Sequence, residues 1–229
     1  MKKADIIFMV IVAALLTPFF VSDAVLEAYK SANAAHPYFM AFLKFMILSS
    51  IGEMVGLRIK QGVYSYQGYG MIPRAIVWGF LGVLIAFAMN IFKNGTPVLL
   101  QTLGFENACQ AMMGSFSWDK LITAFCISTA MNTIFAPVFM TLHKITDAHI
   151  AANGGSLRAL VTPIPMAQRF AGINWEAQWG FVFKKTIPFF WYPAHTVTFL
   201  LPSEQRVLFA ALLGIALGVL LALSAKKGK

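Results

Sequence analysis

Polar side chains stand out within residues 189–206, an otherwise apolar stretch that reads FFWYPAHTVTFLLPSEQR. Tyr192, His195 and Thr198 recur every three residues, so they fall along one face of a helix. Pro193 has no N–H to offer the preceding turn, and the carbonyl that it leaves free is tolerated in lipid only against protein or a wet cavity. The stretch therefore predicts a helix with a hydrogen-bonding face that turns away from lipid.

A second polar set lies in an earlier apolar run and contains Ser128, Asn132 and Thr133, followed by Pro137. We interpret the two sets as the lining, or the gate, of an aqueous path between two helices. The alternative is that they form hydrogen bonds that hold the helices together, each worth about 0.6 kcal/mol. An imidazole in contact with water titrates near neutral pH, so His195 suits either a pH-linked gate or a structural hydrogen bond.

Two opposite charges lie near the same end of consecutive apolar runs. Glu53 is close to the inner end of the second run, and Arg74 is at the inner start of the third. An ionised side chain near the middle of a bilayer costs about 2.5–3.5 kcal/mol, so such groups usually face the bundle and pair. We therefore predict a structural ion pair between Glu53 and Arg74. The alternative is that each side chain reaches water at the interface.

Catalysis and metal binding have little support in the sequence. His143 and Asp147 are four residues apart and could share a helical face, with His149 close by. No HExxH, GxSxG or paired-carboxylate pattern accompanies them, and Cys109 and Cys126 form no CxxC pair. A solvated helix end is the better interpretation, so we expect no metal, no cofactor and no enzymatic activity.

The composition shows what kind of element must position these groups. Of the 229 residues, 59% are hydrophobic and only 12% are charged, whereas a soluble domain carries about 25% charged residues. Most of the surface is therefore expected to face lipid. The net charge of +9 comes from basic residues that flank apolar runs, a pattern that indicates membrane topology and not nucleic-acid binding.

Six apolar runs approach the length of about 20 residues that crosses the hydrocarbon core of a bilayer. They cover residues 5–22, 37–57, 73–93, 119–142, 180–201 and 205–224. We expect an all-α polytopic transmembrane bundle with six spans and both termini on one side. Residues 97–116 are also apolar, but they contain Gln101, Glu106, Asn107 and Gln110, so we place this region at the membrane interface.

The Lys and Arg residues predict the orientation through the positive-inside rule. With both termini in the cytoplasm, the outer side holds only Lys30, Lys93, Lys120 and Arg206. The first apolar run is followed by no small-residue cleavage site, so we interpret it as a retained span and not as a signal peptide. Its MKK start is typical of a bacterial inner-membrane protein, which makes that membrane the expected location.

Small residues mark where helices pack closely. Ala210, Gly214, Gly218 and Ala222 are spaced at intervals of four in the sixth run, the pattern that lets helix backbones touch in lipid. We favour packing within the chain, and a homo-oligomer interface is the alternative.

Three motifs, at residues 33–38, at Gly52-Glu53 and at residues 191–206, resemble those of the Mpv-seventeen family, small membrane proteins of mitochondria and peroxisomes. Residues 33–38, NAAHPY, are similar to its AAHPW opening, and Gly52-Glu53 stands where the family has Gly-Asp. Residues 191–206, WYPAHTVTFLLPSEQR, resemble its closing W-P-x-x-Q-x-x-N-F-x-x-V-P-x-x-x-R signature. His195 takes the place of the Gln, and Thr198 replaces the Asn.

The resemblance covers residues 31–224, so residues 1–30 are expected to add one span before a family-like core within a single transmembrane domain (1–229). It implies a divergent, bacterial member, or a mitochondrial or peroxisomal protein if the chain is eukaryotic. It also implies a channel for small solutes.

Three functions are therefore weighed. The first is a channel or transporter for small solutes or metabolites, supported by the polar stripe and by the resemblance. The second is a non-transporting membrane scaffold or assembly protein, and the third, less favoured, is an intramembrane enzyme. The expected partners are membrane lipid and a small-molecule solute, with a homo-oligomer as a further option and no nucleic acid.

Overall fold

The computed structural model describes residues 3–227, with side chains through residue 216 together with Gly218. Every regular element in this range is helical, which confirms the predicted all-α class. The chain divides into two compact units, Met1–Met40 and Ala41–Lys229. The sequence places a boundary at residue 30, and the first compact unit extends ten residues further, to Met40.

The first unit contains three helices, α1 (Lys3–Leu16), α2 (Pro18–Val21) and α3 (Asp23–Ala35). Pro18 suits the first turn of α2 because a proline there gives up no helical hydrogen bond. The Ser22 hydroxyl caps α3 by accepting the Val25 N–H at 3.4 Å. The segment Lys3–Val21 is apolar, and no residue of its most apolar 18-residue stretch is buried within the protein.

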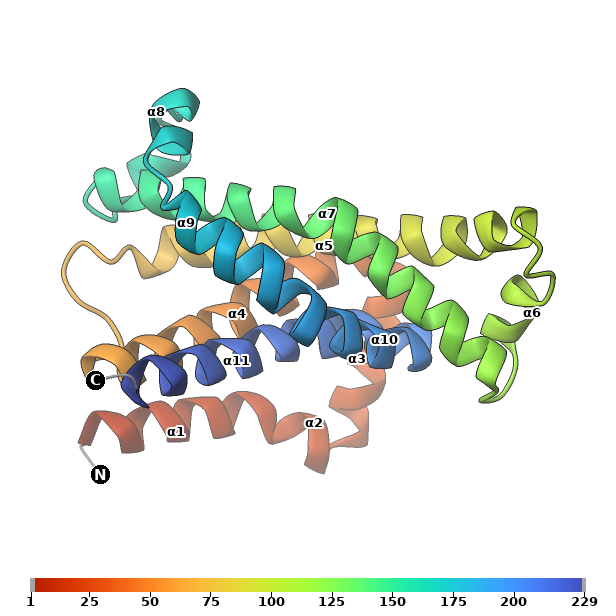
Figure 1. The fold of residues 1–229 in the computed structure, drawn as a ribbon. Helices are drawn as coiled ribbons and strands as arrows, with labels where there is room; N and C mark the ends of the chain where they lie inside the picture. Colours follow the sequence, from red (N-terminus) through yellow and green to blue (C-terminus); the bar gives the residue numbers. More distant parts are fainter. Residues whose placement is uncertain (1–2, 228–229) are drawn as a thin grey trace. The chain divides into compact units, whose positions relative to one another are not determined.

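The second unit begins within α4. Its two longest helices, α5 and α7, then form an antiparallel hairpin (Figure 1). The helices of this part are α4 (Pro37–Gln61), α5 (Met71–Thr102), α6 (Ala108–Met113) and α7 (Trp118–Ala152). The Ser117 hydroxyl caps α7 by accepting the Lys120 N–H at 3.1 Å. Of the region predicted to be interfacial, residues 97–102 continue α5, and Ala108–Met113 form the short α6.

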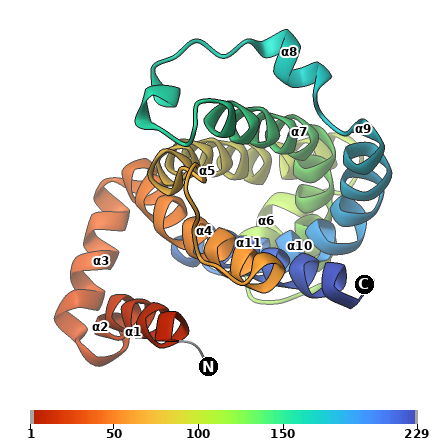
Figure 2. The same cartoon turned by 90° about the vertical axis from the view of Figure 1, so that its left-hand side faces the viewer.

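The rest of the chain returns along α7. Its elements are η1 (Leu157–Leu160), α8 (Met166–Ala171), α9 (Trp175–Ala177), η2 (Gln178–Trp191), α10 (Tyr192–Leu200) and α11 (Ser203–Lys227). Within the second unit, α7 packs against α5 on one side and against η2 and α10 on the other. Figure 2 looks along these helices from the end where α8 and α9 lie.

η2 is a π-helix, in which each N–H reaches the carbonyl five residues back. π-Helices usually occupy a single turn, but this one continues for 14 residues with Pro188 in its interior. The Thr186 hydroxyl follows the same spacing and donates to the Phe181 carbonyl at 3.4 Å. Trp175 to Leu200 is therefore a run of consecutive helical elements whose hydrogen-bond register changes at Tyr192.

Among the residues that the structure describes, four helical segments are long and apolar enough to cross a membrane, and they coincide with the first four predicted spans. They are Lys3–Val21, Pro37–Gln61, Met71–Thr102 and Trp118–Ala152. The fifth predicted span falls on η2 and α10, where the change of helix type divides it into two shorter elements. The sixth falls on α11, whose side chains are described only in part.

Small residues let α4 lie against two neighbours at close range. On the α5 side, a Cβ added to Gly82 would overlap the Cβ of Phe45. On the α11 side, a Cβ added to Gly52 would lie 3.0 Å from the Ile215 Cα, and one added to Gly218 would lie 3.5 Å from the Gly52 carbonyl oxygen. α4 is therefore held between α5 and α11 by contacts that need glycine.

The predicted stripe on α11 contributes to this packing only in part. Ala210 is buried, and Gly218 approaches Gly52. A Cβ added to Gly214 would meet no atom within 4 Å, and the side chain of Ala222 lies outside the described residues. Within its described part, the stripe therefore joins α11 to α4 at Gly218 and leaves open space at Gly214.

The apolar core lies where α4, α5, α7, α10 and α11 meet. Its buried side chains are Phe45, Leu48, Ala88, Met89, Ala124, Ile127, Met131, Phe199, Ala210 and Ala211. Large apolar side chains such as Phe80, Ile91 and Ile134 are exposed on the outer faces of α5 and α7. Helices that are apolar on both faces are typical of a bundle whose surroundings are lipid.

The close contact between Gly82 and Phe45 predicts that a larger side chain destabilises the protein on the face of α5 that packs against α4. Gly82→Ala should lower the unfolding free energy of the detergent-solubilised protein by about 1–3 kcal/mol, because α4 has to move away from α5. Gly95→Ala, on the same helix with no atom within 4 Å of the new Cβ, should be neutral or stabilising by up to about 1 kcal/mol. Equal losses in thermal or chemical unfolding for the two variants would contradict the proposed packing.

Candidate functional site

A seam of polar side chains joins α7 to α10. The Ser128 hydroxyl donates to the Tyr192 carbonyl at 2.8 Å, and the Asn132 amide nitrogen donates to the Ser128 carbonyl at 2.8 Å. The Asn132 Oδ1 lies 3.1 Å from the His195 Nδ1. At the edge of the seam, the Thr133 hydroxyl and the Tyr192 hydroxyl are 2.6 Å apart. We call these five residues the polar seam.

The centre of the polar seam is closed off from the surface. Ser128 and Asn132 are at most 1% exposed and His195 is 7% exposed, whereas Thr133 is exposed. Thr198, the sixth predicted member, is fully buried, but its hydroxyl turns back to the Ala194 carbonyl of its own helix at 2.9 Å. Five of the six predicted residues are thus brought together by hydrogen bonds, and Thr198 is not.

The hydrogen bonds determine which nitrogen of the His195 imidazole faces Asn132 as a donor. The Asn132 Nδ2 faces a carbonyl, which can only accept, so the Oδ1 of the same amide faces His195. The His195 Nδ1 therefore carries a hydrogen and donates it to the Asn132 Oδ1. The Trp191 ring lies beside the imidazole, with 4.9 Å between the ring centroids. The seam therefore holds the imidazole in one orientation, with Nδ1 toward Asn132.

A second polar group, which we call the inner network, lies at the other end of α7. Arg74 forms an ion pair with Asp147 and donates from Nε to the Tyr69 carbonyl at 2.9 Å. The Tyr69 hydroxyl donates to the Glu53 Oε2 at 3.0 Å. The guanidinium also lies over the Tyr69 ring, 4.7 Å from its centroid. Tyr69 therefore links the charges of α4 and α5.

The imidazole of His143 completes the inner network. Its Nε2 lies 3.4 Å from the Glu53 Oε1 and 3.6 Å from the Asp147 Oδ2. Its ring lies against Trp78, with 4.4 Å between the centroids. The charges that meet here are two carboxylates and one guanidinium, and His143 adds a positive charge only when it is protonated.

The ion pair predicted between Glu53 and Arg74 is corrected by this geometry. Both residues belong to the inner network, but the guanidinium forms its ion pair with Asp147, and Tyr69 is hydrogen-bonded to both Arg74 and Glu53. The reason is position: Asp147, from the end of α7, lies closer to the guanidinium than the carboxylate of the neighbouring helix does. Arg74 on α5 therefore pairs with a carboxylate of α7, although α4 is the helix that precedes α5 in the sequence.

Glycines position Tyr69. Gly70 has a φ of 74° and Gly155 a φ of 70°, a conformation that other residues rarely adopt. A Cβ added to Gly155 would lie 2.6 Å from the Gly70 nitrogen, so the two loops touch through their backbones. Burial raises the pKa of the Tyr69 phenol and the charge of Glu53 raises it further. The phenol therefore stays protonated as a donor.

Metal binding at the inner network involves a different set of residues from the one weighed in the sequence. Ligand atoms of Glu53, His143 and Asp147 lie within 4.8 Å of one another. His149 is buried elsewhere, and its ring nitrogen faces the Asn153 amide at 3.4 Å. A divalent ion would have to compete with Arg74 for the Asp147 carboxylate, so the guanidinium already provides the positive charge of this cluster.

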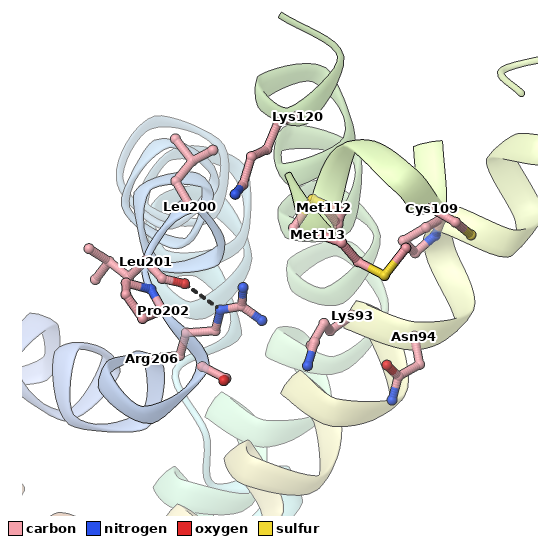
Figure 3. Close-up of a pocket in the computed structure, with 12 residues that line it drawn as sticks. Lys93, Asn94, Cys109, Met112, Met113, Lys120, Leu200, Leu201, Pro202 and Arg206 are labelled. Atoms are coloured by element: carbon pink, nitrogen blue, oxygen red, sulfur yellow. Dashed lines mark hydrogen bonds between the residues drawn. The ribbon is translucent and has the colours of Figure 1, made fainter. Parts of the chain in front are cut away.

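The opposite end of the second unit contains a basic cavity of about 490 Å³ (Figure 3). Lys93, Lys120 and Arg206 contribute to its lining. Arg74 and Lys93 lie on the same helix about 28 Å apart along its axis, at a rise of about 1.5 Å per residue. This separation is close to the thickness of a bilayer's hydrocarbon core, about 30 Å, and the polar seam lies between the two charged ends.

Sequence reasoning missed Tyr69 and Trp78 in the inner network and did not group the three cations of the cavity. Asp147 was noted only for metal binding. A signal for the cavity was present, because Lys93, Lys120 and Arg206 are three of the few basic residues placed on the outer side. No comparable signal pointed to Tyr69, which depends on the docking of two distant loops.

The inner network predicts that Arg74 is coupled to Asp147. In a double-mutant cycle, Arg74→Gln and Asp147→Asn should lower the unfolding free energy with a coupling of about 0.5–3 kcal/mol. Arg74→Gln combined with Lys93→Gln is the control, and it should be additive within about 0.5 kcal/mol because the sites are far apart. Coupling of Arg74 to Glu53 that exceeds its coupling to Asp147 would contradict this assignment.

Comparison with known proteins does not assign the chain to a family. No protein-family model, no curated protein and no solved structure matches it.

Proposed function

We propose that the protein is an integral membrane channel or transporter for small solutes. The observation that carries the proposal is the polar seam, a buried line of hydrogen-bonding groups between two charged ends. Polar side chains inside an apolar layer are costly unless they serve packing or a polar path. Each group of the seam can exchange its present partner for a solute or for water, because hydroxyl, amide and imidazole all donate or accept.

The structure corresponds to a closed state in this proposal. Asn132 sits between Ser128 and His195, and all three are buried. Opening would separate α10 from α7 and replace the hydrogen bonds of the seam with bonds to the passing solute. The Pro-containing helical run of η2 and α10 is suited to such a movement, since π-helical segments are frequent at functional sites.

The proposal includes a topology of six spans with both termini in the cytoplasm of a bacterial cell, and no enzymatic activity. The support is the alternation of basic residues with apolar runs and the resemblance of residues 33–38 and 191–206 to the Mpv-seventeen family. η2 with α10 would form the fifth span and α11 the sixth.

A non-transporting scaffold is the second candidate, and one observation favours it. Gly214 lies on the small-residue stripe of α11, and a Cβ there would meet nothing within 4 Å. An unfilled position on such a stripe is suited to a helix of a partner or of a second copy. In that case the polar seam would serve only to hold α7 and α10 together.

The topology predicts which residues an impermeant thiol reagent reaches from outside intact cells. In a background of Cys109→Ser and Cys126→Ser, Met113→Cys should be labelled, because Met113 is exposed at the outer end. Lys2→Cys and Lys229→Cys should be labelled only after the cells are permeabilised. Labelling of either terminus from outside would overturn the six-span topology.

The channel proposal predicts solute flux that depends on the seam. Proteoliposomes should relax faster than empty liposomes when small polyols are added in stopped-flow light scattering. Asn132→Leu should slow this flux by about tenfold, equivalent to about 1.4 kcal/mol on the barrier, because the central hydrogen-bonding group is lost.

Thr129→Val is the matched control on the same helix. Its hydroxyl has no hydrogen-bond partner among the described residues, so its removal should leave flux unchanged. Folded wild-type protein that leaves liposomes as tight as empty ones would contradict transport and favour the scaffold. Equal flux in Asn132→Leu and wild type would show that the seam is not the path.

A further inference from the structure

We propose that the basic cavity at the outer end binds an anionic phosphate group. The cavity lies between the end of α5, α6, the start of α7 and the turn from α10 to α11 (Figure 3). Lys93, Lys120 and Arg206 are among the twelve residues that line it. None of the twelve is acidic, and these three are cations.

Arg206 supplies the most specific part of the argument. Its side chain is only 8% exposed. It donates from Nε to the Leu201 carbonyl at 2.9 Å and from Nη2 to the Phe199 carbonyl at 3.0 Å. These bonds close the turn between α10 and α11 and point the remaining end of the guanidinium toward the cavity (Figure 3).

The third guanidinium nitrogen of Arg206, Nη1, is buried and has no partner among the described residues. A buried charged donor without an acceptor costs free energy. The carbonyls of the turn account for Nε and Nη2 but not for Nη1. An anionic oxygen in the cavity would satisfy it and would lie where a charge-assisted hydrogen bond forms.

The two lysines bring further donors to the same space. The Lys120 Nζ donates to the Gly114 carbonyl at 2.6 Å, which leaves two of its three N–H groups. Lys93 makes no hydrogen bond or ion pair with any described residue, and its electrostatic partner is the exposed Glu204. Both ammonium groups are therefore available to an anion.

Glu204 and Asp119 lie outside the wall of the cavity, although Glu204 attracts Lys93 and Arg206 from its exposed position. Glu204 is fully exposed and accepts a hydrogen bond from Ser203 at 3.0 Å. Asp119 accepts a hydrogen bond from the Asn107 amide at 3.4 Å. Neither carboxylate lines the cavity, so three positive charges face it with no compensating charge in its wall.

A phosphate group suits this arrangement better than a single carboxylate does. Its oxygens are arranged tetrahedrally, so they can meet donors that come from three elements, α5, α7 and α11. Ser203 is the first residue of α11 and lines the cavity, so the positive end of that helix dipole adds to the attraction. Met112, Met113 and Leu200 give the cavity an apolar side.

Two sources could provide this chemistry, a phospholipid headgroup and free phosphate. The cavity is at the end of the bundle where a headgroup would lie, and the apolar side suits the start of an acyl chain. Free inorganic phosphate meets the same three cations. The site is an equilibrium binding site, so it does not depend on whether solutes cross the bundle.

Equilibrium dialysis of radiolabelled inorganic phosphate tests the site on the full-length protein in an uncharged detergent at fixed ionic strength. Wild type should show saturable binding. Lys93→Gln should weaken it by about tenfold, the loss expected for one charge-assisted contact. Lys144→Gln removes the same charge from an exposed position at the other end of α7, so it should bind as wild type does.

A lipid arm distinguishes the two sources. Protein in nanodiscs of phosphatidylcholine should bind phosphate, and phosphatidylglycerol in the nanodisc should compete if the headgroup is the occupant. Competition assigns the site to lipid, and phosphate binding without competition assigns it to the free anion. Absence of saturable binding in detergent and in phosphatidylcholine nanodiscs, or equal binding by Lys93→Gln and Lys144→Gln, would overturn the proposal.

Arg206 needs a conservative variant because it also closes a turn. Arg206→Lys keeps the positive charge but loses the planar guanidinium, whose several N–H groups reach both the carbonyls of the turn and the cavity. It should weaken phosphate binding more than Lys144→Gln does, while circular dichroism reports whether the helices remain. Lys93→Gln, which breaks no hydrogen bond of the described structure, keeps the test valid if Arg206→Lys does not fold.

Discussion

A hydrogen-bonding group inside an apolar layer has to find its partner within the protein, and this constraint organises the second unit. It explains why α7 and α10 lie together, since the Ser128 hydroxyl reaches backbone carbonyls of Trp191 and Tyr192 at the junction of the π-helix and the α-helix. It explains why Asn132 and His195 share one hydrogen bond. The apolar core fills the space around these pairs, and the charged groups are left at the ends of the helices.

Much of the fold follows from composition and periodicity. Long apolar runs bounded by basic residues predict helices, and four of the six coincide with helices able to cross a membrane. The three-residue spacing of Tyr192, His195 and Thr198 holds because they lie in the α-helical part of the run. The sequence also predicts that these residues face the polar residues of α7, because both sets consist of polar side chains within apolar runs.

Other features depend on distances that the sequence does not record. Asp147 reaches Arg74 from a helix distant in the sequence, and only the docking of Gly70 against Gly155 brings Tyr69 between the charges. The π-helical register is not predicted either, because residues 180–191 are recognised in the sequence only as part of an apolar span. Thr198 shows what helical spacing cannot predict. It lies on the predicted face of the helix, but its hydroxyl donates to the Ala194 carbonyl of its own helix.

The length of the π-helical segment fixes the rotation of everything that follows it. A shift of one residue in hydrogen-bond register turns the next residues by about 100° around the helix axis. η2 runs directly into α10 with helical angles at Tyr192. The wide turns of η2 therefore determine the direction in which His195 points around the axis of α10. Tightening a single turn of η2 to α-helical spacing would rotate the imidazole away from Asn132 and present a different side of α10 to α7.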